Sequence, residues 1–119
     1  MRKILCLLAT ILVLHTSGLA QDGATKETAV NDEIKTLLVS KFQFSTDQAD
    51  KIVTIENEFH ASLDAIKEAG EKMPLKEREK RKHDAHITRR ANLAAIPMKG
   101  RQMEDVMELV ESIRRKHKL

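Results

Sequence analysis

The chain has 119 residues, a formal net charge of +3, one cysteine and three aromatic side chains, all of them phenylalanine. This length suits one domain. Because tryptophan and tyrosine are absent, an aromatic-rich core is excluded, and helix packing must come from aliphatic side chains and methionine. A single cysteine excludes an intrachain disulfide framework. The basic residues are not interleaved with aromatic rings on which bases stack, so we expect no nucleic acid partner.

Residues 1–20 have the organisation of a cleavable signal peptide. Arg2 and Lys3 precede a nearly unbroken apolar run, and Gly18 and Ala20 supply small residues at positions −3 and −1 of a cleavage site. Eleven helical residues rise only ~16 Å, about half of the hydrocarbon thickness, so we expect no transmembrane anchor after cleavage. Cleavage removes the only cysteine and leaves 19 basic and 18 acidic side chains. We therefore expect an exported protein whose mature chain is nearly neutral.

The mature chain begins with a polar stretch, residues 21–30, which we expect to be a flexible tail. Residues 31–119 are expected to form a single α-helical domain. No segment alternates apolar and polar residues between turn residues, so the sequence predicts no strands. A first helix is expected from Asn31 to about Lys41, because Asn31 is a good N-cap and the apolar residues that follow share one face.

The segment Phe44-Ser45-Thr46-Asp47-Gln48 predicts the start of a second helix through a capping box. In this motif the Ser45 hydroxyl accepts a hydrogen bond from the Gln48 amide, and the Gln48 side chain accepts one from the Ser45 amide. Phe44 precedes the cap and is expected to pack on the first turn. The helix is expected to end at Gly70. Its predicted apolar stripe is Ile52, Ile55, Phe59, Leu63 and Ile66.

Two prolines delimit a third, strongly charged helix. Pro74 opens it, and it runs to about Ala95, where Pro97 either breaks or kinks it. A fourth helix then ends near Lys116. The third helix offers only a narrow apolar face, consisting of Leu75, Ala85, Ile87, Ala91 and Ala94. Because such thin faces make a monomeric core marginal, we expect a homodimer.

Charge is segregated along the chain: residues 72–101 hold 10 basic and 3 acidic side chains, whereas residues 22–71 hold 5 and 11. One interpretation is a solvated helix face, with Glu77 paired to Arg81 one turn later. The other is a surface that attracts anionic partners such as acidic unfolded segments. The client- or partner-binding candidates are Arg78, Arg81, Lys82, Arg89 and Arg90, with Met103 and Met107 as adaptable apolar contacts.

The capping motif at Phe44-Ser45-Thr46-Asp47-Gln48 and the segment Met98-Lys99-Gly100-Arg101-Gln102 resemble the paired Leu-Thr-x-x-Gln motifs of the Spy/CpxP family of periplasmic chaperones. The Arg-rich helix between them is also similar, and the resemblance covers most of the mature chain. The second segment departs from the pattern, because Lys99 cannot cap as threonine does. We therefore expect the fourth helix to fray or to start later, near Gly100. The matching positions are Phe44, Ser45, Gln48, Met98 and Gln102.

The resemblance implies an all-α fold of about four helices in an elongated antiparallel hairpin or cradle, assembled as a dimer. It also implies an ATP-independent periplasmic chaperone or envelope-stress protein that binds unfolded or aggregation-prone proteins. The absence of a glycine-rich phosphate loop agrees with this, and we expect no cofactor. Two alternatives stay open: a metal-sensing or metal-resistance envelope protein, and a regulatory module that docks onto a sensor partner.

The histidines offer little chemistry. His83 and His86 are three residues apart, a spacing at which two ligands can reach one ion, but the basic residues 80–82 repel a cation, so we expect no metal there. His60 is expected at the edge of the core and His117 in a frayed end. No serine is expected beside a histidine with an orienting acid, and no carboxylate is expected in an apolar pocket, so we expect no enzyme.

Overall fold

The computed structural model describes the backbone of residues 21–119 and the side chains from Lys26 onward. This part of the chain is all-helical, as predicted, with no strand. Its elements are α2 (Gln21–Phe42), α3 (Thr46–Ala69), the short 3-10 helix η1 (Gly70–Lys72), α4 (Leu75–Ala94) and α5 (Gln102–Lys116). The predicted signal peptide lies outside the described residues. No helix among those described combines the length and the apolar composition that a membrane span requires.

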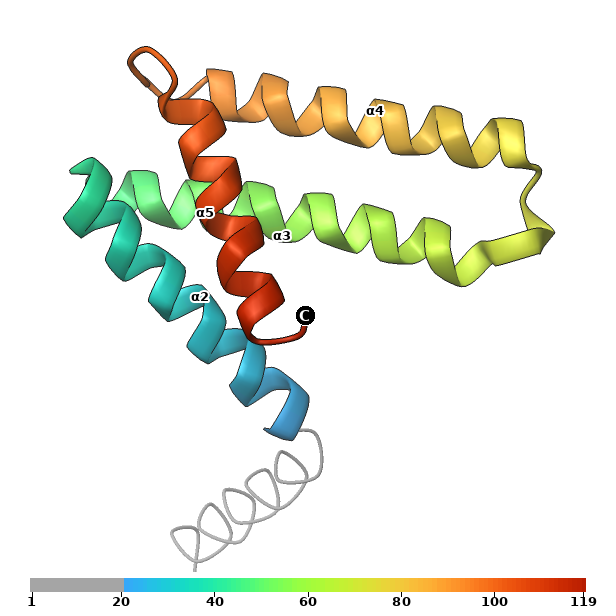
Figure 1. Cartoon of the computed structure of the whole chain (residues 1–119), viewed down its shortest axis with the longest axis horizontal. Coiled ribbons are helices and arrows are strands. Elements are labelled where there is room, and N and C mark those ends of the chain that lie inside the picture. The colour runs from blue at the N-terminus through green and yellow to red at the C-terminus, as the bar shows by residue number, and fades with distance from the viewer. Residues whose placement is uncertain (1–20) are drawn as a thin grey trace, which may run out of the picture.

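The helices form two antiparallel pairs. α3 and α4 make a hairpin that turns at η1, while α2 packs against both α3 and α5. In Figure 1 the α2–α5 pair crosses the end of the hairpin where α3 begins and α4 ends, and the other end of the hairpin extends alone toward η1. The described chain is therefore a packed four-helix crossing with a two-helix arm. This agrees with the antiparallel hairpin expected from the sequence.

The core lies at the crossing of the two pairs. Leu38 of α2, Ile52 of α3 and Val106 of α5 are completely inaccessible to solvent. The full set of buried core residues is Val30, Ile34, Leu38, Phe44, Ala49, Ile52, Val53, Leu93, Ile96, Val106, Val110 and Ile113. Almost all are aliphatic, as the composition requires, and each large side chain contributes about 1.5–3 kcal/mol on burial. Phe59 and Ile66, further along α3, are also buried but lie outside this cluster.

The start of α3 has the predicted capping box. The Gln48 amide donates to Ser45 Oγ at 3.1 Å, and the Ser45 amide donates to Gln48 Oε1 at 3.0 Å. Phe44 is buried beside the cap. At the other end, Gly70 has a positive φ of 51° and its amide donates to the carbonyl of Ile66, so α3 ends where expected.

α2 begins earlier than the sequence indicated. Residues 21–30, expected as a tail, are helical, so the helix starts ten residues before Asn31. Val30, the last of these residues, is 0% exposed, whereas residues 26–29 before it are exposed. Val30, Ile34 and Leu38 are spaced by four and occupy one helix face, so the apolar stripe extends N-terminally past the predicted cap.

The apolar face predicted for α4 is wrong. Leu75 is 65% exposed and Ile87 is 52% exposed, whereas Arg89 and Leu93 are the buried residues of this helix. The uncertainty at Pro97 is resolved in favour of a break, because α4 ends at Ala94 and α5 starts only at Gln102. The break is expected physically, since proline has no amide hydrogen and restricts the residue before it.

Candidate functional site

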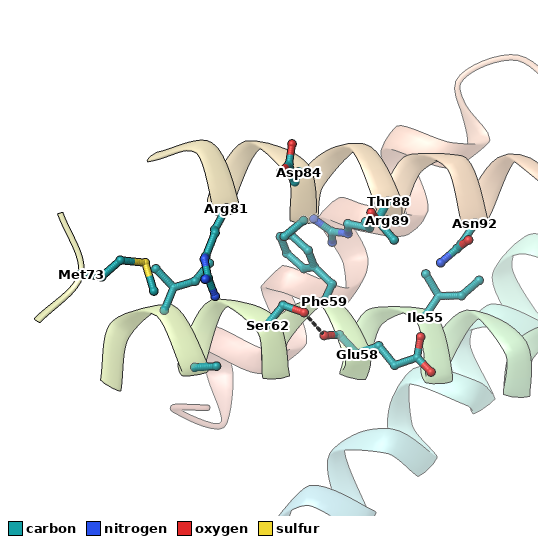
Figure 2. A pocket seen from close by; sticks show the side chains of 13 residues that line it. Ile55, Glu58, Phe59, Ser62, Met73, Arg81, Asp84, Thr88, Arg89 and Asn92 are labelled. Atoms are coloured by element: carbon teal, nitrogen blue, oxygen red, sulfur yellow. Dashed lines mark hydrogen bonds between the residues drawn. The ribbon is translucent and has the colours of Figure 1, made fainter. Parts of the chain in front are cut away.

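An open groove with a volume of ≈ 460 Å³ runs between α3 and α4 (Figure 2). The residues of α4 that line it are Arg81, Asp84, Ala85, Thr88, Arg89 and Asn92. None of these is a large aliphatic residue, so α4 has no knobs to fill the space above α3. The groove exists because this face of a charged helix is small or polar.

The other wall is more apolar. α3 contributes Ile55, Glu58, Phe59, Ser62, Ala65 and Ile66, and Met73 lies beside the turn at η1. The Ser62 hydroxyl donates to the backbone carbonyl of Glu58 at 3.0 Å, as the dashed line in Figure 2 shows. Apolar side chains therefore alternate with polar ones along the groove. Its acidic residues, Glu58 and Asp84, are matched in number by Arg81 and Arg89.

Phe59 and Arg89 point toward each other between the two helices (Figure 2). The guanidinium carbon of Arg89 lies 4.2 Å from the centroid of the Phe59 ring, a cation–π contact. Two histidine rings pack against the Phe59 ring. The distance between ring centroids is 4.8 Å for His86 and 5.1 Å for His60. This aromatic cluster links the groove to the charged residues behind it.

A buried ion cluster lies behind Phe59. The Glu56 side chain is 1% exposed and that of Arg89 is 7% exposed. Arg89 Nε donates to Glu56 Oε1 at 3.0 Å and Nη2 donates to Glu56 Oε2 at 2.5 Å, which is a bidentate pair. Nη2 also donates to Glu111 Oε1 at 3.2 Å. One guanidinium thus connects α3, α4 and α5.

His60 borders this cluster. Its Nε2 lies 2.9 Å from Glu111 Oε1, but the atom is inaccessible to solvent and lacks the geometry of a hydrogen bond. Burial lowers the pKa of His60 and outweighs the opposite influence of the Glu111 carboxylate, while Arg114 and Arg89 add to the lowering. Burial also raises the pKa of Glu56 despite the hydrogen bonds from Arg89. Burial therefore favours the neutral form of the His60 imidazole over the charged form.

The predicted basic surface is only partly present. Arg81, Lys82 and Arg90 are exposed, and Arg78 is half-buried. Arg81 forms the predicted pair with Glu77, with 2.9 Å between Nη2 and Oε1. Arg89 does not belong to this exposed surface, because its guanidinium is buried against a carboxylate, although the residue also lines the groove.

The other candidates lie in different surroundings. Met103 and Met107 are half-buried and pack against the core, so they are structural contacts rather than a free apolar surface. His83 and His86 are exposed, and His86 packs on Phe59. His117, expected to be frayed, lies 2.7 Å from Glu33 through its Nε2.

The two motif segments meet in space. The Gln102 side chain accepts a hydrogen bond from the Lys99 amide at 3.1 Å and donates one to the Phe42 carbonyl at 3.3 Å. The residues of both motifs line one hollow, consisting of Phe42, Gln43, Phe44, Gln48, Pro97, Met98, Lys99 and Gln102. The Gln102 side chain thus accepts a hydrogen bond from an amide three residues earlier, as the Gln48 side chain does. Lys99 has no hydroxyl to complete a capping box, and α5 begins at Gln102, later than the expected start near Gly100.

Sequence reasoning missed Glu56 and Glu111. The signal for Glu56 was available, since it lies four residues after Ile52 and three before Phe59, on the buried stripe of α3. A carboxylate at such a position needs a partner, because an unpaired buried charge is strongly unfavourable. Nothing in local spacing identifies that partner as Arg89, which is 33 residues away.

Comparison of the chain with models of protein families, with curated proteins and with solved structures gave no match. What the groove and the ion cluster can do therefore follows from their own residues.

Proposed function

We propose that this chain is an exported, ATP-independent chaperone that binds unfolded or aggregation-prone proteins in the groove between α3 and α4. The observation that supports this most directly is the groove itself, which is open and lined by both apolar and polar side chains. An unfolded segment exposes both kinds of group. Apolar side chains gain from contact with residues such as Phe59 and Met73, and polar groups keep partners on the rim.

The charge of α4 supports the same function. Arg81 lines the groove, and Lys82 lies next to it on the exposed side of the helix. A basic rim raises the rate at which acidic segments encounter the groove, while contributing less to final affinity. Binding of this kind is weak and rapidly reversible, which suits a chaperone without a nucleotide cycle.

The proposal includes periplasmic location and a homodimer. The organisation of residues 1–20 supports export. Leu75 and Ile87, both more than half exposed on α4, support further burial of apolar surface in an assembly. The resemblance of the two glutamine-containing motifs to those of Spy/CpxP chaperones supports the class of function.

An aggregation assay tests the proposal. A client protein denatured by heat or reduction is followed by light scattering, with and without a molar excess of this chain. We expect suppression of scattering, and we expect Ala65→Trp to abolish most of it because the indole fills the groove. Ala91→Trp is the matched control, since Ala91 is exposed on α4 and does not line the groove.

Two outcomes contradict the proposal. The first is no suppression by the unaltered protein at any ratio. The second is equal loss of suppression in Ala65→Trp and Ala91→Trp, which would place binding elsewhere than in the groove. Circular dichroism of both variants verifies that each remains helical.

A further inference from the structure

The ion cluster contains three side chains with the chemistry of metal ligands. Glu56 and His60 lie four residues apart on α3, so they share one helix face, and α5 brings Glu111 beside them. One ligand atom from each lies within 4.8 Å of the other two. One imidazole and two carboxylates, from two helices, therefore lie together in the described part of the chain. This group does not include His83 or His86.

We propose that Glu56, His60 and Glu111 form a binding site for a zinc ion, which replaces the guanidinium of Arg89 as the cation between the two carboxylates. Nitrogen and carboxylate oxygen together are a common zinc donor set, and three protein ligands leave a position for water. Calcium and magnesium prefer all-oxygen sites, so an imidazole ligand disfavours them.

The His60 ring already faces the cluster. Its side chain is 15% exposed, and its Nε2 is inaccessible to solvent and lies 2.9 Å from Glu111 Oε1. An ion bound between these two atoms would be a ligand partner for both of them.

Arg89 marks the position of positive charge in this cluster. Its guanidinium contacts both carboxylates, at 3.0 and 2.5 Å to Glu56 and at 3.2 Å to Glu111. Arg114 is a second positive charge close enough to influence both Glu56 and His60, so the cluster is already near balance and an incoming ion must take the place of Arg89 rather than join it. Both cations cannot occupy one small buried site, because they repel each other at short range. Zinc binding therefore requires that the guanidinium move away.

There is room for that movement. Arg89 lines the α3–α4 groove on one side and, on the other, a hollow of ≈ 320 Å³ that also includes Glu108 and Glu111. Glu58 in the groove, or Glu108 in the hollow, offers a carboxylate to a displaced guanidinium. The same hollow reaches Glu111 and would be the path of entry for an ion, which would pass Arg90 and Arg115.

Isothermal titration calorimetry of the purified protein with zinc chloride tests the site. We expect saturable binding of one ion per chain, and no binding of magnesium or calcium. His60→Gln and Glu111→Gln should each weaken zinc binding at least tenfold. The matched control, His83→Gln with His86→Gln, should bind zinc as the unaltered protein does. Unchanged affinity in His60→Gln, or loss of binding in the control, overturns the proposal.

Arg89→Gln adds a test that separates exchange from simple coordination. Removing the competing cation should tighten zinc binding at least tenfold, and zinc should raise the melting temperature of this variant more than that of the unaltered protein. Equal zinc affinity in Arg89→Gln and in the unaltered protein would show that zinc does not replace the Arg89 guanidinium. If a variant fails to fold, imidazole NMR of the unaltered protein decides: zinc must shift the His60 ring signals first. Failure to bind zinc would not contradict the proposed chaperone function, because the aggregation assay can be run with a chelator present.

Discussion

Arg89 of α4 makes a bidentate ion pair with Glu56 of α3, with 3.0 Å between Nε and Oε1, and both side chains are more than nine-tenths buried. The guanidinium also lies over Phe59 and contacts Glu111, so it joins three helices at one point. Along the groove α4 presents no large aliphatic side chain to α3, and its one buried aliphatic residue, Leu93, lies in the core at the crossing. The position of α4 over α3 along the groove therefore depends on the buried charge pair.

The first prediction concerns this pair. Arg89→Met should lower the free energy of unfolding by about 3–5 kcal/mol, because it leaves the Glu56 carboxylate buried without a partner. Adding Glu56→Leu should restore most of that loss, since two well-packed apolar residues need no charge compensation. Urea denaturation followed by circular dichroism measures both values.

Arg90→Ala is the control for the pair. Arg90 is the next residue of α4, its side chain is 54% exposed, and it lies 3.7 Å from Glu104. An exposed pair of this kind contributes little, so the change should stay within about 0.5 kcal/mol. A loss in Arg89→Met no larger than in Arg90→Ala would show that the buried pair does not organise the arm.

The second prediction concerns pH. The pKa of His60 is lowered from the usual 6.5 by burial, so the unfolded chain takes up a proton at this side chain at a higher pH than the folded chain. The free energy of unfolding should therefore fall as pH drops below 6.5 toward the lowered value. His60→Gln should remove this part of the pH dependence. His83→Gln, which changes an exposed histidine, should retain it; equal slopes in the two variants would contradict the assignment.

The contrast between local and long-range chemistry explains which features were predictable. The Ser45–Gln48 capping box lies within four residues, and its two hydrogen bonds follow from residue type and spacing alone. The pairing of Arg89 with Glu56 joins residues far apart in sequence, and no periodicity indicates it. A charged helix was therefore interpreted as a surface, although one of its arginines belongs to the interior.

The same contrast accounts for the errors on α4. Leu75 and Ile87 are apolar and lie at spacings that favour an inward face, yet both are exposed. α4 contacts only α3 over most of its length, so apolar positions that point away from α3 have nothing to pack against. Sequence periodicity identifies a face but not whether a neighbour covers it. The groove was unpredictable for this reason, because it depends on which face of α4 meets α3.

The third prediction compares the two motif glutamines. Gln102 makes two hydrogen bonds, one to the Lys99 amide and one to the Phe42 carbonyl of another helix, whereas Gln48 makes only the reach-back bond. Gln102→Ala should therefore lower the free energy of unfolding by about 1–3 kcal/mol, since each bond contributes about 0.5–1.5 kcal/mol. Gln48→Ala should cost roughly half as much. Chemical denaturation ranks the two, and the reverse order would mean that the Phe42 contact adds nothing.

The last prediction tests the N-terminal extension of α2. Val30 is 0% exposed and packs in the core, while Val39, on the same helix, is 41% exposed. Val30→Ala should lower the free energy of unfolding by about 1–3 kcal/mol, from lost burial of two methyl groups and the cavity that remains. Val39→Ala should change it by less than about 0.5 kcal/mol. If residues 21–30 were a tail, Val30 would make no packing contacts, and urea denaturation would show the two variants to be equally stable.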